Sequence, residues 1–209
     1  MQGMLYRLAR AFMHIILFIF YRVKPLGGEN LPKKGGVILA ANHQSFFDPI
    51  VVGCAARGDV TFLARRTLFK NKFFGLLLRH LKTYPIERDR TDLRAIKAAI
   101  KRLKNGDIIL IFPEGTRSYD GKLQPVKHGF SMLAVRAEVP IVPVYVRGTF
   151  DIWPRTRRFP SLFGRITCRF GTPIDPAGFT SVSRKDTEKN ITAAVEAALK
   201  ELERAAFSK

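Results

Sequence analysis

The chain of 209 residues has few cysteines and few acidic side chains. Its two cysteines, Cys54 and Cys168, lie far apart in apolar stretches, so nothing indicates a disulfide framework, and no Cys/His cluster indicates a metal site. Asp and Glu number 17 against 36 Lys and Arg, which gives a net charge of +19. Such an imbalance favours an anionic partner, which could be nucleic acid, a membrane surface or an anionic soluble substrate or carrier.

The sequence also lacks the marks of a nucleic-acid-binding protein. It has no zinc-finger spacing, no aromatic ribonucleoprotein motif and no basic tail. The basic residues are instead spread along the chain, which fits an anionic membrane surface better. With 46% hydrophobic residues, no repeats and no low-complexity segment, the chain reads as one globular domain.

The longest apolar run is short. Ala11–Tyr21 is broken only by His14 and is flanked by Arg7 and Arg10 on one side and by basic residues on the other. As a helix it spans roughly 16 Å, about half of the bilayer's hydrocarbon thickness, and no small-residue cleavage site follows it. We expect a helix lying in one leaflet, the alternative being a helix packed on the protein's own core. The expected membrane anchors are Phe12, Ile16, Phe18 and Phe20.

The rest of the chain divides into a linker and a domain. We assign residues 1–23 to the N-terminal hydrophobic helix, the Pro- and Gly-containing residues 24–36 to a linker, and 37–209 to the domain. Apolar runs alternate with helical patterns there, which predicts an α/β fold with a largely parallel mixed sheet flanked by helices. The expected strands are 37–41, 60–64, 83–87, 108–112, 141–146 and 166–170. The expected helices are 46–56, 91–104, 129–136 and 186–206.

The segment Asn42–Asp48 (NHQSFFD) follows the first of these strands. It pairs an imidazole, His43, with a carboxylate, Asp48, which together can take a proton from a hydroxyl near neutral pH. The spacing allows a second interpretation, in which Ser45 caps a helix and Asp48 is the capping-box carboxylate at the third helical position. His43 and Asp48 can meet only if His43 lies before the helix and folds back over its first turn.

The segment Phe112–Ser118 (FPEGTRS) follows another expected strand, at the same edge of the sheet. Arg117 offers a planar fork that matches a phosphate, and Gly115 permits a tight turn with exposed amides. The alternative is an ordinary turn with a solvated pair between Glu114 and Arg117.

In this order, the two motifs resemble those of the glycerolipid acyltransferases, specifically the 1-acyl-sn-glycerol-3-phosphate acyltransferase (lysophosphatidic acid acyltransferase) family. Residues 64–90 and 139–144 are similar to two further blocks of that family, and the likeness extends from about residue 24 to residue 171. In the family the His-x4-Asp signature is catalytic, so the resemblance implies that His43 is the base and Asp48 its partner.

The resemblance also implies the remaining site residues. The substrate phosphate would be held by Arg88, Glu114, Gly115, Thr116 and Arg117, although Glu87 precedes Arg88 where relatives often have Asp. Walls for the acyl chain are expected at Phe73, Phe74 and Pro143.

The implied reaction moves an acyl chain from acyl-CoA or acyl-ACP, an acidic carrier protein, to the 2-hydroxyl of 1-acylglycerol-3-phosphate. The product is phosphatidic acid, and no cofactor is expected beyond the acyl thioester co-substrate. We expect a monotopic enzyme on the cytoplasmic face of the cell membrane. The alternatives are an acyltransferase for another lysolipid, such as lyso-ornithine lipid, and a non-catalytic protein that binds anionic lipid.

Overall fold

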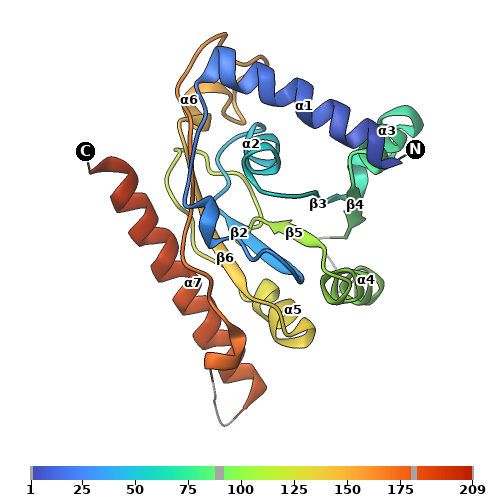
Figure 1. The fold of residues 1–209 in the computed structure, drawn as a ribbon, viewed down its shortest axis with the longest axis vertical. Helices are drawn as coiled ribbons and strands as arrows, with labels where there is room; N and C mark the ends of the chain where they lie inside the picture. The colour runs from blue at the N-terminus through green and yellow to red at the C-terminus, as the bar shows by residue number, and fades with distance from the viewer. Residues whose placement is uncertain (1, 88–91, 180–182, 209) are drawn as a thin grey trace.

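The computed structural model describes residues 2–87, 92–179 and 183–208 (Figure 1). Its centre is a seven-stranded sheet with the order β1-β7-β6-β2-β5-β3-β4. Neighbouring strands are parallel except for β6 and β7, which are antiparallel. The strands are β1 Lys24–Leu26, β2 Val37–Ala41, β3 Val60–Arg65, β4 Thr83–Ile86, β5 Ile108–Ile111, β6 Ile141–Arg147 and β7 Thr167–Phe170. The α-helices are α1 Gln2–Tyr21, α2 Asp48–Ala55, α3 Lys72–His80, α4 Leu93–Lys104, α5 Gly129–Ala137, α6 Thr149–Ile152 and α7 Arg184–Phe207.

Helices cover both faces of the sheet, as expected for an α/β domain. In β2 the side chains of Val37, Leu39 and Ala41 join the core beneath α1 and α2, while Ile38 and Ala40 join the core beneath α4, α5 and α7 (Figure 1). Successive strand residues point to opposite faces, so a strand buried on both faces must be apolar throughout. The predicted α/β fold with a largely parallel mixed sheet is therefore confirmed.

The segment expected to be a linker contributes a strand. Lys24–Leu26 forms β1, which pairs in parallel with β7 at the edge of the sheet. Pro25 suggested a linker, but an edge strand tolerates proline because its free side needs no N–H donor. Gly27 follows with a φ of 71°, and a Cβ there would lie 2.1 Å from the carbonyl oxygen of Phe170. Glycine therefore permits this close approach of β1 to β7.

The N-terminal helix is longer than the apolar run from which it was expected. α1 has 20 residues, and at about 1.5 Å per residue its length no longer excludes crossing a bilayer. Tyr6, Leu17 and Tyr21 are nevertheless buried against the domain, whereas Phe12 and Phe18 are exposed. One face of the helix therefore packs on the core, while the other stays apolar and open to solvent, and its place in a leaflet stays a prediction.

Candidate active site

The site lies where three adjacent strands end. β6, β2 and β5 are neighbours in the sheet, and all three run in parallel. His43 follows β2, Glu114 follows β5 and Thr149 follows β6. Ligands of open α/β sheets bind at this carboxyl edge. The topology therefore gathers polar side chains from three distant parts of the sequence.

His43 and Asp48 are in contact. The His43 Nδ1 lies 2.9 Å from the Asp48 Oδ2, and the His43 ring stacks on Phe112 with centroids 3.9 Å apart. Asp48 is fully buried, whereas 12% of the His43 side chain is exposed. Because Nδ1 faces the carboxylate, Nε2 is the nitrogen left to exchange a proton with a substrate.

Asp48 is held by hydrogen bonds to both of its oxygens. Its Oδ2 also accepts from the backbone N–H groups of Gln44 and Ser45, each at 2.7 Å. Its Oδ1 accepts from the Thr149 hydroxyl at 2.6 Å. A buried carboxylate with this many donors is fixed in position. Its orientation relative to His43 is set before any substrate arrives.

The local structure around Asp48 differs from the capping box of the second interpretation. α2 begins at Asp48, which is its first residue and not its third. Ser45 does not cap the helix: its hydroxyl accepts from Phe47 N at 3.1 Å and donates to the carbonyl of Trp153 at 2.7 Å. The loop therefore turns tightly before α2, which folds His43 back over Asp48 as contact between them requires.

Glu114 braces the loop that carries His43. Its Oε1 accepts from His43 N at 2.7 Å, and its Oε2 accepts from Gln124 N at 3.1 Å. The Ser118 N–H donates in turn to the His43 carbonyl at 2.8 Å. Burial raises the pKa of Glu114 to about 7, although the two backbone donors act to lower it. The two motifs therefore form one hydrogen-bonded unit.

The side chain of Arg117 packs on the aromatic ring of Phe46. Its guanidinium carbon is 3.6 Å from the centroid of Phe46, a cation–π contact. Arg155 donates to the Arg117 carbonyl at 3.2 Å. Gly115 has a φ of 75°, and a Cβ there would lie 3.0 Å from the Lys127 ammonium. Thr116 is exposed on the same turn.

Four further expected site residues lie outside this hydrogen-bonded unit or outside the described residues. Arg88 lies outside the described residues. Phe73 and Phe74 are on α3, where 86% of Phe73 is exposed, so neither forms an enclosing wall for an acyl chain in this structure. Pro143 is buried within β6, opposite Ala40 of β2.

Sequence reasoning missed Thr149, Lys127 and Arg155. Thr149 could have been found, because it follows the end of β6 at the same edge as His43 and Glu114. Lys127 and Arg155 come from loops, where no periodic pattern sets their position. Only the folded chain shows that they approach the turn at Gly115–Arg117.

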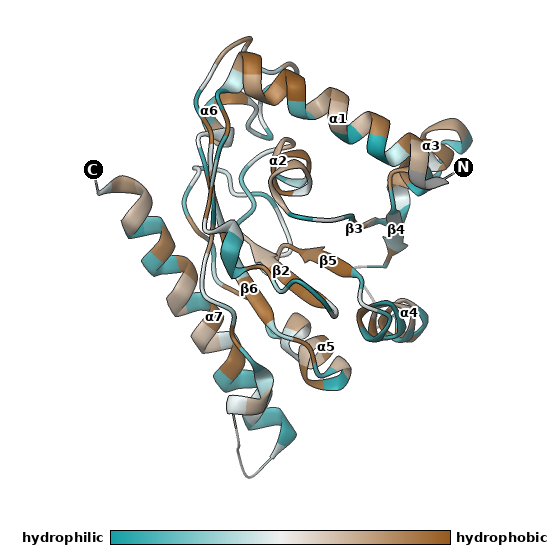
Figure 2. Cartoon of the chain, in the orientation of Figure 1, coloured by the Kyte–Doolittle hydropathy of each residue, from teal (hydrophilic) through white to brown (hydrophobic). Residues whose placement is uncertain are grey.

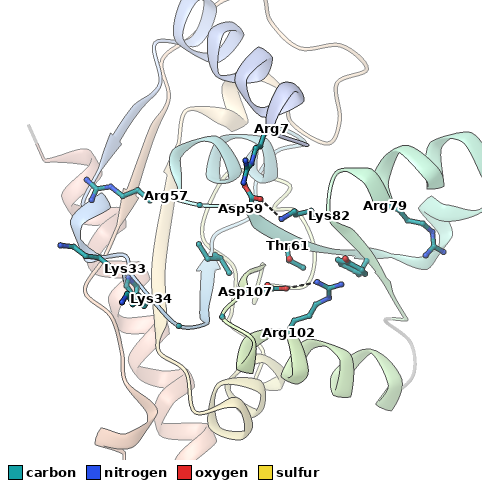
Figure 3. Close-up of a pocket in the computed structure, with 16 residues that line it drawn as sticks. Arg7, Lys33, Lys34, Arg57, Asp59, Thr61, Arg79, Lys82, Arg102 and Asp107 are labelled. Atoms are coloured by element: carbon teal, nitrogen blue, oxygen red, sulfur yellow. Dashed lines mark hydrogen bonds and ion pairs between the residues drawn. The ribbon is translucent and has the colours of Figure 1, made fainter. Parts of the chain in front are cut away.

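A hollow of about 510 Å³ lies at the opposite, amino edge of the sheet (Figure 3). Most of its charged lining residues are cations, and its two carboxylates are already paired, Asp59 with Lys82 at 2.7 Å and Asp107 with Arg102 at 2.9 Å. None of the residues placed at the carboxyl edge lines it. Within the described ranges, no group of three or more His, Cys, Asp or Glu side chains could hold a metal ion.

Comparisons with known proteins agree with this geometry. A family model described as Acyltransferase matches residues 22–147, which include His43, Asp48 and Glu114–Arg117. The 1-acyl-sn-glycerol-3-phosphate acyltransferase of Bacillus subtilis is 30% identical over 200 residues, covering 95% of this chain and 97% of that protein. The enzyme of the same name from Saccharomyces cerevisiae is 38% identical over 148 residues, 68% of this chain and 48% of that protein.

A solved structure is similar over nearly the whole chain. The crystal structure of the 1-acyl-sn-glycerophosphate (LPA) acyltransferase PlsC from Thermotoga maritima has a TM-score of 0.76 and 31% identity, covering 96% of this chain and 81% of that one. The chain therefore belongs to the acyltransferase family, among the 1-acyl-sn-glycerol-3-phosphate acyltransferases.

Proposed function

We propose that this protein acylates the 2-hydroxyl of lysophosphatidic acid with an acyl thioester and so forms phosphatidic acid. The observation that carries the proposal is the contact of 2.9 Å between His43 and the buried Asp48, at the carboxyl edge of the sheet. A non-catalytic lipid-binding protein would need neither side chain in this arrangement.

In the proposed reaction, His43 acts as the base. Its Nε2 takes the proton of the 2-hydroxyl while the hydroxyl oxygen attacks the thioester carbonyl. When the tetrahedral intermediate collapses, the C–S bond breaks and the imidazolium returns the proton to the leaving thiolate. Asp48 keeps Nδ1 protonated and stabilises the imidazolium, and its fixed position means that little reorganisation is needed during the step.

We assign the phosphate of the acceptor to the turn at Gly115–Arg117. Arg117 supplies a guanidinium, and the ammonium of Lys127 lies beside the same turn. Arg155 reaches this turn from the segment after α6. A phosphate held there would fix the distance between the 2-hydroxyl and His43, which is how positioning lowers the barrier. Arg88 is a further proposed phosphate ligand by its place in the motif.

We assign the donor to acyl-CoA or to an acyl carrier protein. A hollow of about 780 Å³ lies between β4, α4 and the segment after β3, and Arg65, Arg66, Lys70 and Arg94 are among its lining residues. Several cations around one hollow suit the phosphates of either donor. Because Arg65 ends β3, this hollow reaches the same edge of the sheet as His43.

We further propose that the enzyme is monotopic on the cytoplasmic face of a membrane, with Phe12 and Phe18 on its lipid side. Both are exposed on α1, as a lipid contact requires. Ile16 and Phe20, the other expected anchors, are partly buried against the core and contribute less to lipid contact.

The decisive experiment offers the purified protein a panel of lysolipids with labelled oleoyl- and palmitoyl-thioesters, and identifies the products by mass. We expect phosphatidic acid from lysophosphatidic acid, and a loss of about 10²–10⁴-fold in turnover for His43→Ala. Products only from a lysolipid without a phosphate, such as lyso-ornithine lipid, would reassign the acceptor. Hydrolysis or transfer by His43→Ala at the wild-type rate would exclude the mechanism.

Arg117→Lys in the same assay tests the phosphate site. It keeps the charge but loses the planar fork, so the KM for lysophosphatidic acid should rise while kcat changes less. An equal loss with a lysolipid that has no phosphate monoester would assign Arg117 a structural role instead.

A further inference from the structure

α1 is docked along the domain, and this fixes its direction. Near its N-terminus the Tyr6 hydroxyl accepts a hydrogen bond from Val60 N at 3.1 Å. Arg10 donates to two carbonyls of the loop between α2 and β3, at 2.5 and 2.6 Å. Near its C-terminus, Leu17 and Tyr21 are buried in the core. A helix attached at both ends cannot cross a bilayer without taking the domain with it.

The opposite face of α1 is an unbroken apolar stripe. Its members recur every three or four residues, the spacing of one helix face, and each is more than half exposed. α1 is hydrophobic over much of its length in Figure 2. The stripe consists of Met4, Leu8, Phe12, Ile15 and Ile19.

α3 presents a second apolar stripe beside the N-terminal half of α1 (Figure 1). Phe73, Leu76 and Leu77 fall on one face of α3, and all three are exposed. α3 packs closely on the preceding 3-10 turn, Arg66–Phe69, where a Cβ on Gly75 would lie 3.0 Å from the carbonyl oxygen of Phe69. The exposed stripe therefore has no role in packing the domain.

A third apolar surface, residues 157–163, lies at the other end of α1. Phe163 stacks on Phe20 with centroids 5.8 Å apart, and the Tyr21 hydroxyl donates to the Ser161 carbonyl at 3.0 Å. Phe159, Leu162 and Phe163 are each about two-thirds exposed, at 67, 66 and 66%. These contacts fix the segment beside the last turn of α1 (Figure 1).

The charged side chains within these segments have one sign. Residues 2–21, 66–80 and 153–165 contain no Asp or Glu, but each contains Arg or Lys. Arg158 lies 5.2 Å from the Phe159 ring, so a cation borders the apolar side chains directly. Apolar side chains bordered by cations are complementary to an anionic leaflet, which offers hydrocarbon below a layer of phosphates.

We propose that α3 and residues 157–163 contact the bilayer together with the outer stripe of α1. The three form one membrane-contacting surface that holds α1 in the plane of a single leaflet. The proposal rests on the proposed function, in which the acceptor and the product are membrane lipids. It assigns Phe73 to lipid contact in place of an acyl-chain wall.

This surface is directly connected to the candidate active site. Trp153, which precedes residues 157–163, packs on Phe46 and Phe47 at centroid distances of 5.0 and 5.3 Å. Phe46 in turn carries the guanidinium of Arg117. A lysolipid leaving the leaflet beside this segment would thus meet the proposed phosphate site within the same cluster of side chains.

Single-cysteine labelling tests the surface in the full chain. Both native cysteines are buried, so a cysteine introduced at Leu76, Leu162 or Leu93 can be labelled with an environment-sensitive fluorophore. Leu93 on α4 is the matched control, since its exposure of 62% lies between the 56% of Leu76 and the 66% of Leu162. Vesicles of equal parts phosphatidylcholine and phosphatidylglycerol should shift the emission to the blue at 76 and 162 but not at 93. A bound protein without a shift at either 76 or 162 would overturn the proposal.

Glutamine variants test how much the surface contributes to membrane binding. They also distinguish a failure of this proposal from a failure of the proposed function. Leu76→Gln and Leu162→Gln should each weaken vesicle partitioning about tenfold, whereas Leu93→Gln should leave it within about twofold. With water-soluble short-chain substrates all three variants should match the wild type. Equal partitioning of all three variants would overturn the proposal that this surface contacts the bilayer. Wild type that binds vesicles but transfers no acyl chain would overturn the proposed function alone.

Discussion

At the scale of single residues, the candidate site is built around the carboxylate of Asp48, whose two oxygens both accept hydrogen bonds. Asp48 could be foreseen as the partner of His43, because the sequence spacing allowed contact if the loop folded back. Thr149 lies 101 residues further along the chain, so its spacing from Asp48 does not indicate the contact, and only its place just after β6 does. Sequence spacing finds local partners, whereas partners across a sheet depend on strand order, which spacing does not encode.

Thr149 should therefore act as a positioning residue. Thr149→Val removes the hydroxyl but keeps the shape, which leaves one buried oxygen of Asp48 without its donor. We expect kcat to fall on the order of tenfold with KM nearly unchanged, because the acceptor phosphate binds elsewhere. Thr149→Ser restores the donor and should recover most of the rate. If Ser and Val lowered kcat equally, packing of the methyl group and not the hydrogen bond would be responsible.

Glu114 should make stability depend on pH. In the folded state its pKa is raised by burial to about 7, above the ordinary value of 4.5. The folded protein thus holds a proton that the unfolded chain releases near pH 4.5. This contribution to stability is fully present below that pH and is lost as the pH rises through 7. Relative to Glu114→Gln, the wild type should lose stability from weakly acidic to weakly basic pH.

Melting temperatures of both proteins across this range provide the measurement. The glutamine variant places an amide group against the N–H of Gln124, but that cost does not change with pH. Only the pH-dependent part of the difference therefore reports on the proton. A constant difference in Tm across the range would mean that Glu114 is ionised throughout.

At the scale of elements, sequence patterns predicted six of the seven strands but not β1, which lies at the edge of the sheet. The expected strands of the domain are found to within one residue at each end, and the four expected helices to within two. Long apolar runs and helical stripes carry that information, since burial on both faces or on one face dictates their period. β1, with three residues and a proline, is too short to show any period.

α1 shows a second limit of prediction from sequence. Its run Ala11–Tyr21 is apolar on nearly all sides, so hydrophobicity alone could not distinguish a helix in lipid from a helix on the core. The structure distinguishes a buried face of α1 from an exposed one, so substitutions on the two faces should have different effects. Leu17→Ala should cost about 2–5 kcal/mol of folding stability, because it leaves a cavity in the core. Phe12→Gln should change stability by no more than about 0.5 kcal/mol.

Vesicle binding should rank these variants in the opposite order. Folded Leu17→Ala keeps the outer stripe and should bind anionic vesicles as the wild type does, whereas Phe12→Gln should bind more weakly. Chemical denaturation and vesicle sedimentation on the same samples measure both quantities. Loss of stability without loss of binding in Phe12→Gln would show that its ring packs on protein and not on lipid.

At the scale of the whole molecule, charge and apolar surface act together on one partner. The net charge of +19 says nothing about fold, but it attracts any anionic surface over roughly a Debye length, about 8 Å at physiological salt. Apolar burial acts only on contact and is not screened. The sequence indicated both contributions separately. Their arrangement on one side of α1 required the folded structure, because α3 and residues 157–163 are distant from α1 in the chain.

The two contributions should separate in a salt series. On vesicles of phosphatidylcholine alone, only the apolar surface acts, so binding should be weak and nearly constant with added NaCl. On vesicles with phosphatidylglycerol, each cation near the surface adds about 1 kcal/mol at low salt, so binding should start much tighter. It should then fall toward the neutral-vesicle value near 1 M salt, where the Debye length is about 3 Å. Sucrose at equal osmolarity is the control, since it screens nothing. Complete release from the anionic vesicles at high salt, with no binding to the neutral vesicles at any salt, would mean that charge alone holds the protein and that the stripe of α1 never enters the leaflet.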